Sequence, residues 1–298
     1  MSLRVNVQFG AGSILLGLAV YGFLIEPAWV EVTYHRQPIK GLLITNYSWV
    51  RTVGPSSNSV PPRVRVVQVS DLHLHQFGRT EESVVEKLNA LRPNLLLLTG
   101  DVADRPESLS VLADFLQRVK TKDKFAVLGN WEYWGNVDLQ ELKTIYSRHG
   151  VKLLVNECVE YSNEGFILHI AGLDDFTAGS PDERRIYEQC KDGADGKMSA
   201  STQIARRALI LMQHSPGYFV GRKPLERSYH WLTLSGHTHG GQVALFGYPI
   251  WTPPGSGPFV SGWYVTAFKD LYVSKGVGTS VVPFRFGSRP EIAVFDID

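Results

Sequence analysis

The 298-residue sequence is poor in cysteine, in net charge and in long apolar runs. Its two cysteines, Cys158 and Cys190, imply neither a disulfide framework nor a thiolate metal site. The 30 Lys and Arg residues nearly balance 29 Asp and Glu, so the chain lacks the basic excess that nucleic-acid binding requires. The P-loop pattern Gly-x-x-x-x-Gly-Lys-Ser/Thr does not occur, and ATP-driven chemistry therefore has no support.

The sequence does contain enough apolar residues for a large core. Hydrophobic types make up 44% and charged types 20%, a balance that excludes a disordered tail or a collagen-like repeat. A mean hydropathy of −0.08 excludes a protein with many membrane spans. We expect an N-terminal anchor over residues 1–27, a connecting segment over 28–62 and one catalytic domain over 63–298.

The one long apolar run lies near the N-terminus. From Val7 to Ile25 no residue is charged, and a helix of about 19 residues would be roughly 28 Å long, just enough to cross a hydrocarbon core. A cleaved signal peptide and a buried core helix are the alternatives, but no convincing cleavage site follows the run. We therefore predict an uncleaved transmembrane helix. Two positive charges flank each side, so the positive-inside rule does not fix its orientation.

The rest of the chain alternates apolar runs with helical patterns. The predicted strands are 64–69, 95–98, 125–128, 166–171, 208–213, 231–235, 242–246, 270–274 and 291–297. The predicted helices are 80–91, 107–120 and 138–149. A polar insert over 174–207 is expected to form a loop or a short cap over a site. This alternation predicts an α/β domain with helices on the faces of a sheet.

Polar residues directly follow five of the predicted strands. Those that could bind a metal are two aspartates, one asparagine and four histidines: Asp71, His73, Asp101, Asn130, His214, His237 and His239. In α/β sheets, ligand sites collect outside the carboxyl ends of the strands, so we expect these side chains to meet. The pairs Asp71-x-His73 and His237-x-His239 each place two side chains on one side of an extended segment.

This set of donors suits a pair of divalent ions. Oxygen and imidazole ligands favour manganese, iron or zinc over thiophilic metals. Seven ligands are too many for one ion but suit two ions that share a carboxylate, and two ions about 3.5–4 Å apart can activate water and clamp a phosphoryl group. We predict two divalent metal ions as cofactors, manganese first, with iron, zinc or magnesium as alternatives. Asp101, Asn130 and His214 are the predicted catalytic residues.

These motifs resemble the signature of the calcineurin-like metallophosphoesterase superfamily: Asp-x-His, Gly-Asp-x-x-Asp, Gly-Asn-His-Asp/Glu, His and Gly-His-x-His. The resemblance covers roughly residues 64–298 and fills every ligand position. It implies a four-layer α-β-β-α sandwich in which two packed mixed sheets are flanked by helices. It also implies a first metal on Asp71, His73, Asp101 and His239, and a second on Asp101, Asn130, His214 and His237. Asp104 would orient one of these ligands from behind.

The flanking sequence is similar to the membrane-anchored bacterial branch of that superfamily, in residues 26–34, 235–242 and 272–291. That branch includes broad phosphodiesterases and the UDP-2,3-diacylglucosamine diphosphatase of lipid A biosynthesis. The resemblance implies a lipid-linked nucleotide substrate, cleaved at its pyrophosphate to UMP and lipid X, and implies no protein partner. We expect a membrane-associated enzyme in the inner membrane with a cytoplasmic catalytic domain. A broad membrane-associated phosphodiesterase is the alternative; a non-catalytic scaffold is disfavoured because all seven ligands are present.

One position departs from the family pattern. The histidine that the family has after Gly-Asn is Trp131 here, and an indole can donate a hydrogen bond but cannot act as an acid. An alkoxide leaving group needs a proton, whereas a phosphate monoester, with a second pKa of about 6, hardly does. Trp131 therefore favours a pyrophosphate or an activated ester. Alternatively, Trp131 forms an aromatic wall with Tyr133 and Trp134, and another residue supplies the acid.

Other polar residues allow both a functional and a structural interpretation. His75 could contact substrate, or it could be a solvated loop residue. Four arginines of the polar insert could meet a nucleotide phosphate, but a solvated charged face is the more ordinary explanation: Arg184, Arg185, Arg206 and Arg207.

Overall fold

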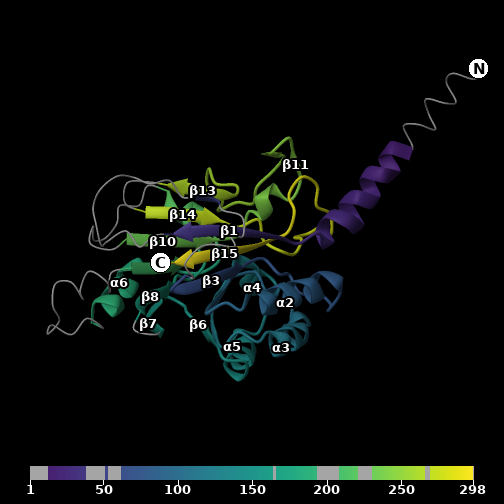
Figure 1. The fold of residues 1–298 in the computed structure, drawn as a ribbon. Helices are drawn as coiled ribbons and strands as arrows, with labels where there is room; N and C mark the ends of the chain where they lie inside the picture. The colour runs from purple at the N-terminus through teal and green to yellow at the C-terminus, as the bar shows by residue number, and fades with distance from the viewer. Residues whose placement is uncertain are drawn as a thin grey trace, which may run out of the picture.

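Two β-sheets packed face to face, with helices on both outer faces, make up most of the molecule (Figure 1). This computed structural model describes residues 13–37, 51–52, 62–163, 166–192, 208–220, 230–265 and 269–297. The layers follow the order helices, first sheet, second sheet, helix. The predicted α/β four-layer sandwich is therefore confirmed.

The first sheet has seven strands in the order β2-β1-β15-β3-β4-β5-β6. Their bounds are β1 Glu31–Gln37, β2 Arg51–Thr52, β3 Val64–Val69, β4 Leu95–Thr99, β5 Asp123–Val127, β6 Val151–Leu153 and β15 Glu291–Ile297. Strands β3 to β6 run parallel, whereas β15 is antiparallel to β3 and parallel to β1. The central strand β4 is buried along its whole length, which explains its uninterrupted run of leucines.

The second sheet has six strands in the order β13-β14-β10-β9-β8-β7. Their bounds are β7 Glu157–Asn163, β8 Phe166–Gly172, β9 Ala208–Met212, β10 His230–Ser235, β13 Gly262–Val265 and β14 Lys269–Val273. The inner four strands are parallel, and the edge strands β7 and β13 are antiparallel to their neighbours. A separate two-stranded ribbon pairs β11 Ala244–Leu245 with β12 Tyr248–Pro249.

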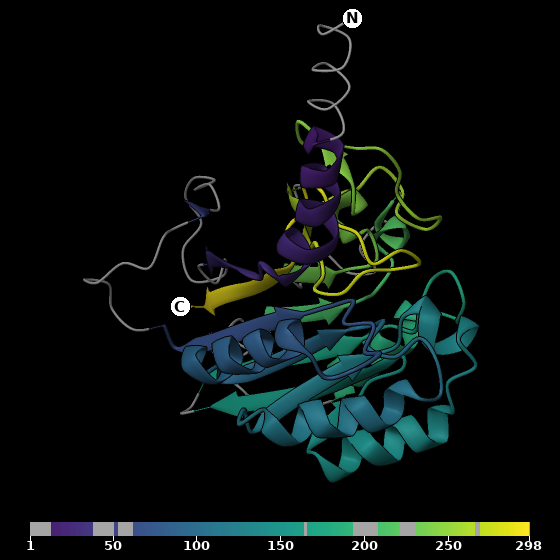
Figure 2. The ribbon, with the colours of Figure 1, turned by 90° about the vertical axis from the view of Figure 1, so that its right-hand side faces the viewer.

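Helices α2, α3 and α5 cover the outer face of the first sheet (Figure 2), and α6, labelled in Figure 1, covers the second. The helices are α2 Arg79–Leu91, α3 Ser108–Arg118, α5 Leu139–Arg148, α6 Glu183–Asp192 and the short α4 Asn130–Trp134. Helix α2 buries Val84, Val85 and Leu88, which lie on one face at helical spacing. The carboxylate of Asp138 accepts hydrogen bonds from the first turn of α5 and fixes where that helix begins.

The core between the sheets is made of apolar side chains that alternate along the strands. Val66 and Leu97 of the first sheet meet Met212 and Leu234 of the second, and all four are almost fully buried. Burial of this kind stabilises the fold by roughly 25 cal/mol for each Å² of apolar surface removed from water. It also fixes how the strand ends of the two sheets face each other, which matters for the site below.

The predicted elements are close to those observed, with differences in the less regular parts. β3 and β15 have the predicted bounds, whereas the strand predicted over 242–246 shortens to β11. The polar insert begins with a described loop over 174–182 and contains α6, whereas its residues 193–207 lie outside the described residues. Residues 31–37, expected in a connecting segment, form β1, which pairs with β15 inside the first sheet.

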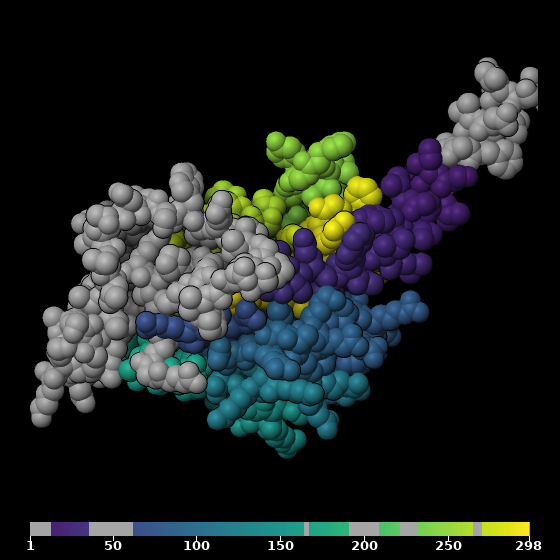
Figure 3. All heavy atoms as spheres, in the orientation of Figure 1, coloured from purple at the N-terminus to yellow at the C-terminus, as the bar shows by residue number. Residues whose placement is uncertain are grey.

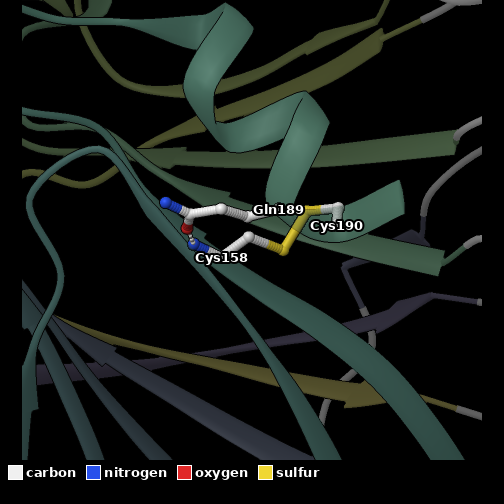
Figure 4. Close-up of a disulfide and its surroundings, with 3 residues drawn as sticks. All are labelled: Cys158, Gln189 and Cys190. Carbon is white, nitrogen blue, oxygen red and sulfur yellow. Dashed lines mark hydrogen bonds between the residues drawn. A yellow bond between two sulfur atoms is a disulfide. The ribbon is translucent and has the colours of Figure 1, made fainter. Parts of the chain in front are cut away.

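The two cysteines form a disulfide between Cys158 of β7 and Cys190 of α6 (Figure 4). The cysteine count predicted no disulfide framework, and the structure contains this single disulfide bond. Beside it, Gln189 accepts a hydrogen bond from the backbone N–H of Cys158 at 2.8 Å. The pairing depends on α6 docking against β7, 32 residues away in sequence, which no local pattern reveals.

The N-terminal segment corrects the predicted transmembrane anchor. Residues 13–20 are α-helical and continue through a π-turn at Tyr21–Ile25 into a short 3₁₀ turn at Glu26–Ala28, while the start of the predicted run lies outside the described residues. Within the described part of the chain, no helix combines the length and the apolar character needed to span a bilayer. This finding contradicts the anchor, and with it the expected inner-membrane localisation with a cytoplasmic domain. The physical reason is that the segment ends against the domain, where Glu26 is buried. Figure 3 shows the purple N-terminal segment meeting the domain beside the yellow C-terminal part of the chain.

Candidate metal centre

The seven predicted ligands all lie just past the carboxyl ends of strands. Those from the first sheet, after β3, β4 and β5, are Asp71, His73, Asp101 and Asn130. Those from the second sheet, after β9 and β10, are His214, His237 and His239. The oxygen ligands therefore come from one sheet, and three of the four imidazoles come from the other.

Five of the seven ligands have a left-handed backbone. The φ angle is +54° at Asp71, +45° at His73, +53° at Asp101, +73° at His237 and +51° at His239. Such conformations cost a non-glycine residue about 1–3 kcal/mol and persist only where the surrounding structure holds them, typically at functional sites. Gly236 is part of that surrounding structure, because a Cβ there would overlap Ser70 and the carboxylate of Asp71.

The first trio of ligand atoms belongs to Asp71, His73 and His239, which are all buried. Nε2 of His239 lies 3.2 Å from Nε2 of His73 and 3.5 Å from Oδ1 of Asp71. Atoms at this spacing could all bind a single cation placed between them.

The second trio belongs to Asp101, His214 and His237, also buried. Nε2 of His214 lies 3.1 Å from Oδ2 of Asp101 and 3.3 Å from Nδ1 of His237. Oδ1 of Asn130 joins this trio at 2.8 Å from Nδ1 of His237. The set again offers oxygen and imidazole nitrogen, with no sulfur.

The two trios form one cluster. Nε2 of His73 lies 3.8 Å from Oδ2 of Asp101, and the backbone N–H of His237 donates to both oxygens of Asp71 at 2.9 and 3.1 Å. The structure thus brings all seven predicted side chains together, although they are spread over most of the domain sequence. Asp101 lies between the trios, as expected of a shared ligand.

Carbonyl groups orient two of the imidazoles. Nδ1 of His214 donates to the carbonyl of Thr99, and Nε2 of His237 donates to the carbonyl of Pro254, both at 2.8 Å. A carbonyl can only accept, so in each ring that nitrogen carries a proton, and the other nitrogen is the one that faces the cluster and could bind a cation. Metal-binding histidines typically have this outer hydrogen bond.

The charge distribution also fits bound cations. Burial would raise the pKa of Asp101, but the imidazoles of His214 and His73 outweigh it and lower the pKa to about 2. Burial, together with the nearby charges of His73 and Arg285, lowers the pKa of His239 well below its usual value. Carboxylate oxygens and imidazole nitrogens converge within 4.8 Å of one another in each trio, a spacing at which they could bind a cation. These Asp and His clusters fit a dinuclear metal centre.

The other predicted site residues lie at the edge of the cluster. Oδ2 of Asp104 lies 3.5 Å from Nδ1 of His73, the position from which a carboxylate would orient that ring. The same oxygen pairs with His75 at 2.6 Å, and Arg105 contacts His75 at 3.0 Å. His75 therefore has protein partners on its exposed loop, and its contact with substrate stays a prediction.

Glu132 has a role beyond those predicted from the sequence. Its buried carboxylate accepts hydrogen bonds of 2.7–3.1 Å from four backbone N–H groups, those of Asp101, Val102, Ala103 and Gly129. Burial and the charge of Asp101 raise its pKa to about 7, while the backbone donors favour the ionised form. Glu132 ties the loops after β4 and β5 together, and the acidic position of the Gly-Asn motif was the signal for it.

Asp175 and Arg285 are two further buried charges that sequence patterns did not reveal. Asp175 accepts hydrogen bonds from Ser215 at 2.6 Å and from Thr177, and so supports the loop that carries His214. Arg285 lies behind His239. Asp175 belongs to no recognisable motif, and Arg285 lies in the stretch 272–291 that resembles the family branch, but the contacts of both residues join distant segments.

The cluster opens into a pocket of about 650 Å³. Asp101, Asn130, His237 and His239 lie among its lining residues. Most of the remaining wall is aromatic or aliphatic: Trp131, Trp134, Val243, Ile250, Trp251, Val281, Val282 and Phe284. Trp131 and Trp134 meet edge to face, with ring centroids 6.0 Å apart. A polar, cation-binding centre thus borders a wide apolar space.

Comparison with known families agrees with this geometry. The sequence profile of the calcineurin-like phosphoesterases matches residues 64–241, a range that contains all seven ligands. The chain belongs to the calcineurin-like phosphoesterase family. The predicted family is confirmed, and the protein is a metal-dependent hydrolase of phosphoric esters, as predicted.

Relatives extend over nearly the whole chain. An uncharacterized metallophosphoesterase of Bacillus subtilis, YkuE, is 29% identical over 297 residues, covering 96% of this chain and 92% of its own. A second, from Aquifex aeolicus, is 32% identical over 243 residues, covering 78% of this chain and 85% of its own. Among solved structures, the NAD nucleotidase of Haemophilus influenzae matches 72% of this chain and 45% of its own, with 15% identity and a TM-score of 0.46.

Proposed function

We propose that this metallophosphoesterase cleaves the pyrophosphate bond of UDP-2,3-diacylglucosamine and releases UMP and lipid X, a step of lipid A biosynthesis. The observation that carries the proposal is the pocket, in which the ligand cluster borders a wall rich in aromatic and aliphatic side chains. A phosphoester bound at the cluster could place acyl chains against that wall. A purely polar substrate would leave most of the wall exposed to water.

In this proposal two divalent ions, manganese first, are held by the seven side chains of the cluster. The first ion would be held by Asp71, His73, Asp101 and His239, and the second by Asp101, Asn130, His214 and His237. When bound, such ions supply charge neutralisation at phosphorus and an activated water. The mixture of carboxylate, amide and imidazole donors suits manganese and gives no preference to thiophilic metals.

The residues around the cluster orient the reacting groups. The backbone N–H of Trp131 donates to Oδ1 of Asp101 at 2.9 Å and fixes the direction of that carboxylate. The Trp131 indole borders the pocket, where its N–H could donate a hydrogen bond to the leaving group but could not protonate it. A phosphate monoester leaves as a stable anion, so cleavage at a pyrophosphate does not need that proton.

A broad-specificity phosphodiesterase is the second candidate, and the pocket lining also offers an argument for it. Few polar side chains, such as Gln242 and Ser280, face the pocket beside the cluster. A wall of this kind recognises apolar bulk rather than one particular sugar or base. In that case the substrate would be any diester with a good leaving group.

The test is to assay the manganese-loaded protein on UDP-2,3-diacylglucosamine and on bis(p-nitrophenyl) phosphate. The proposal expects UMP release from the first substrate with a kcat/KM at least about 100-fold above that for the second. The variant Trp251→Ala, which shortens the apolar wall, should lower kcat/KM for the acylated substrate and leave the small diester nearly unchanged. Activity confined to bis(p-nitrophenyl) phosphate would replace the proposal with the broad phosphodiesterase.

A further inference from the structure

Arg285 is a fully buried arginine held by a cage of backbone carbonyls. Its guanidinium donates hydrogen bonds of 2.6–3.4 Å to the carbonyls of Lys275, Gly276, Gly278, Ser288 and His239. Burial lowers its pKa to about 10, which leaves the side chain cationic at neutral pH. Burying a charge is costly unless hydrogen bonds compensate for it, so this residue needs an explanation beyond packing.

The carbonyl cage places Arg285 directly behind one metal ligand. Nη2 of Arg285 lies 3.3 Å from Nδ1 of His239, and the carbonyl of His239 also accepts from Oγ of Ser288 at 2.8 Å. His239 has a left-handed backbone, which only the surrounding contacts can maintain. The second trio is supported differently, by the carbonyls of Thr99 and Pro254. Arg285 and Ser288 therefore hold the backbone of His239, a member of the first trio, through its carbonyl.

The N-terminal segment holds the loop that carries Arg285. The buried carboxylate of Glu26 accepts hydrogen bonds from the backbone N–H groups of Gly287 at 3.0 Å and Ser288 at 2.6 Å. The backbone carbonyl of Gly22 accepts from the backbone N–H of Arg285 itself at 2.9 Å. The segment is therefore bonded to the backbone of Arg285 and of the residues that follow it.

Ring contacts add to this docking. The rings of Phe23 and Phe284 meet with centroids 4.8 Å apart. At Gly22, a Cβ would overlap the Phe284 ring, so the close approach requires glycine there. Figures 1 and 2 show the purple N-terminal segment beside the yellow loop that precedes β15.

We propose that residues 21–26 are a structural part of the metal centre, in which Glu26 and Arg285 act as positioning residues that set the affinity of the first metal position through His239. This inference rests on the two-metal centre of the proposed function. It adds that the two metal positions respond unequally to changes in the N-terminal segment. Among the described contacts, those of this segment reach the first metal position, through Arg285 and His239. Displacing that segment would empty the first position before the second.

The test is manganese titration of the full chain, followed by calorimetry and by electron paramagnetic resonance, which distinguishes a coupled pair of ions from a single one. Glu26→Gln should weaken one of the two binding steps by about 10-fold, and Arg285→Met by about 100-fold, with the other step changed by less than about 3-fold. The matched controls are Glu31→Gln and Arg289→Met, which remove a carboxylate and a guanidinium that have other partners, Lys275 and Trp29. Both controls should bind two ions as the unchanged protein does.

A double-mutant comparison identifies the affected position. In a His239→Ala background the first metal position is already impaired, so adding Glu26→Gln should cause no further loss of manganese affinity. In a His214→Ala background, Glu26→Gln should still weaken binding of the remaining ion. Equal weakening of both ions by Glu26→Gln, or none, would overturn the proposal. If Arg285→Met does not fold, as thermal unfolding would show, the Glu26→Gln series decides alone. An unchanged protein that binds no pair of ions would instead refute the two-metal centre itself.

Discussion

The two sheets contribute to the site in different ways. The first sheet supplies its ligands from consecutive strand–helix units, with Asp71, Asp101 and Asn130 following β3, β4 and β5 in order. The second sheet supplies imidazoles from β9 and β10, whose neighbours in the sheet include β14 and β8. It also carries the disulfide on its outer side. Within each sheet the strands that carry ligands are consecutive in the chain, and the packing of the two sheets brings the oxygen ligands of the first together with the imidazoles of the second.

The largest expected effect is at Asp101, the first-sheet ligand that lies between the two trios. Asp101→Ala should lower kcat/KM by at least about 10³-fold, or about 4 kcal/mol, because it removes the carboxylate proposed to be shared by both ions. Steady-state kinetics with manganese and bis(p-nitrophenyl) phosphate would measure it.

The matched control for that substitution is Asp114→Ala. Asp114 forms an exposed ion pair with Arg118 on α3, so its loss should leave kinetics unchanged. Near-normal turnover in Asp101→Ala would show that the two trios do not act through a common carboxylate.

The next effect concerns the second sheet, which the disulfide joins to α6. Replacing both cysteines, Cys158→Ser with Cys190→Ser, should lower the free energy of unfolding by roughly 3–4 kcal/mol, because the bond closes a loop of about 32 residues. Urea unfolding of the variant and of the unchanged protein, with and without dithiothreitol, would measure the change. Reduction should have no effect on the double variant. A loss below about 1 kcal/mol would mean that packing of α6 suffices.

The order of the strands within each sheet also explains what the sequence could predict. The apolar runs of β3 and β4, and the polar residues that follow them, are adjacent in the chain, so strand and ligand appear in one pattern. The same holds for His237 and His239 after β10. Trp131 was recognisable as a departure because the residues around it match a motif.

Other features depend on segments far apart in sequence and could not be predicted. Glu26 meets Ser288 across most of the chain, and Cys158 reaches Cys190 through the docking of α6. β1 has an ordinary strand pattern, but only its pairing with β15 places it in the first sheet. The composition of the apolar N-terminal run predicts a helix but not that Glu26 at its end is buried against the domain, while Ile14, Leu15 and Leu16 stay exposed. Local sequence patterns predict helices and strands, whereas contacts between segments far apart in sequence determine how these elements pack together.

A third prediction tests the contact between the sheets at His35. This side chain of β1 stacks on Phe295 of its own sheet, and Trp263 of the second sheet donates a hydrogen bond to its Nδ1 at 3.1 Å. Burial lowers the pKa of His35 from 6.5 to about 4, so the folded protein holds it neutral.

The pH dependence follows from the direction of that shift. Above about pH 6.5 the histidine is neutral in both states and the full stability is present; below it the unfolded chain binds the proton and the folded protein does not. Stability should therefore fall by about 3 kcal/mol as the pH falls from 6.5 to 4. The variant His35→Gln should lose less over this range. If the free energy of unfolding falls equally with pH in both proteins, protonation of His35 does not cause the loss of stability.

The smallest expected effect is at Trp131, where the first-sheet half of the site departs from the family pattern. Trp131→His would restore an imidazole at the pocket wall, close to the ring of His73, whose centroid now lies 6.2 Å from that of the indole. A general acid contributes most where the leaving group is poor, so hydrolysis of alkyl diesters should rise about 10- to 100-fold. Pyrophosphate cleavage should change by less than about 3-fold, because its leaving group needs no proton. Trp131→Phe is the control, since it keeps an aromatic wall without an acid and should leave alkyl diesters poor substrates. If His and Phe variants raise or lower both reactions together, the indole acts as a wall that shapes the pocket, and the acid comes from elsewhere.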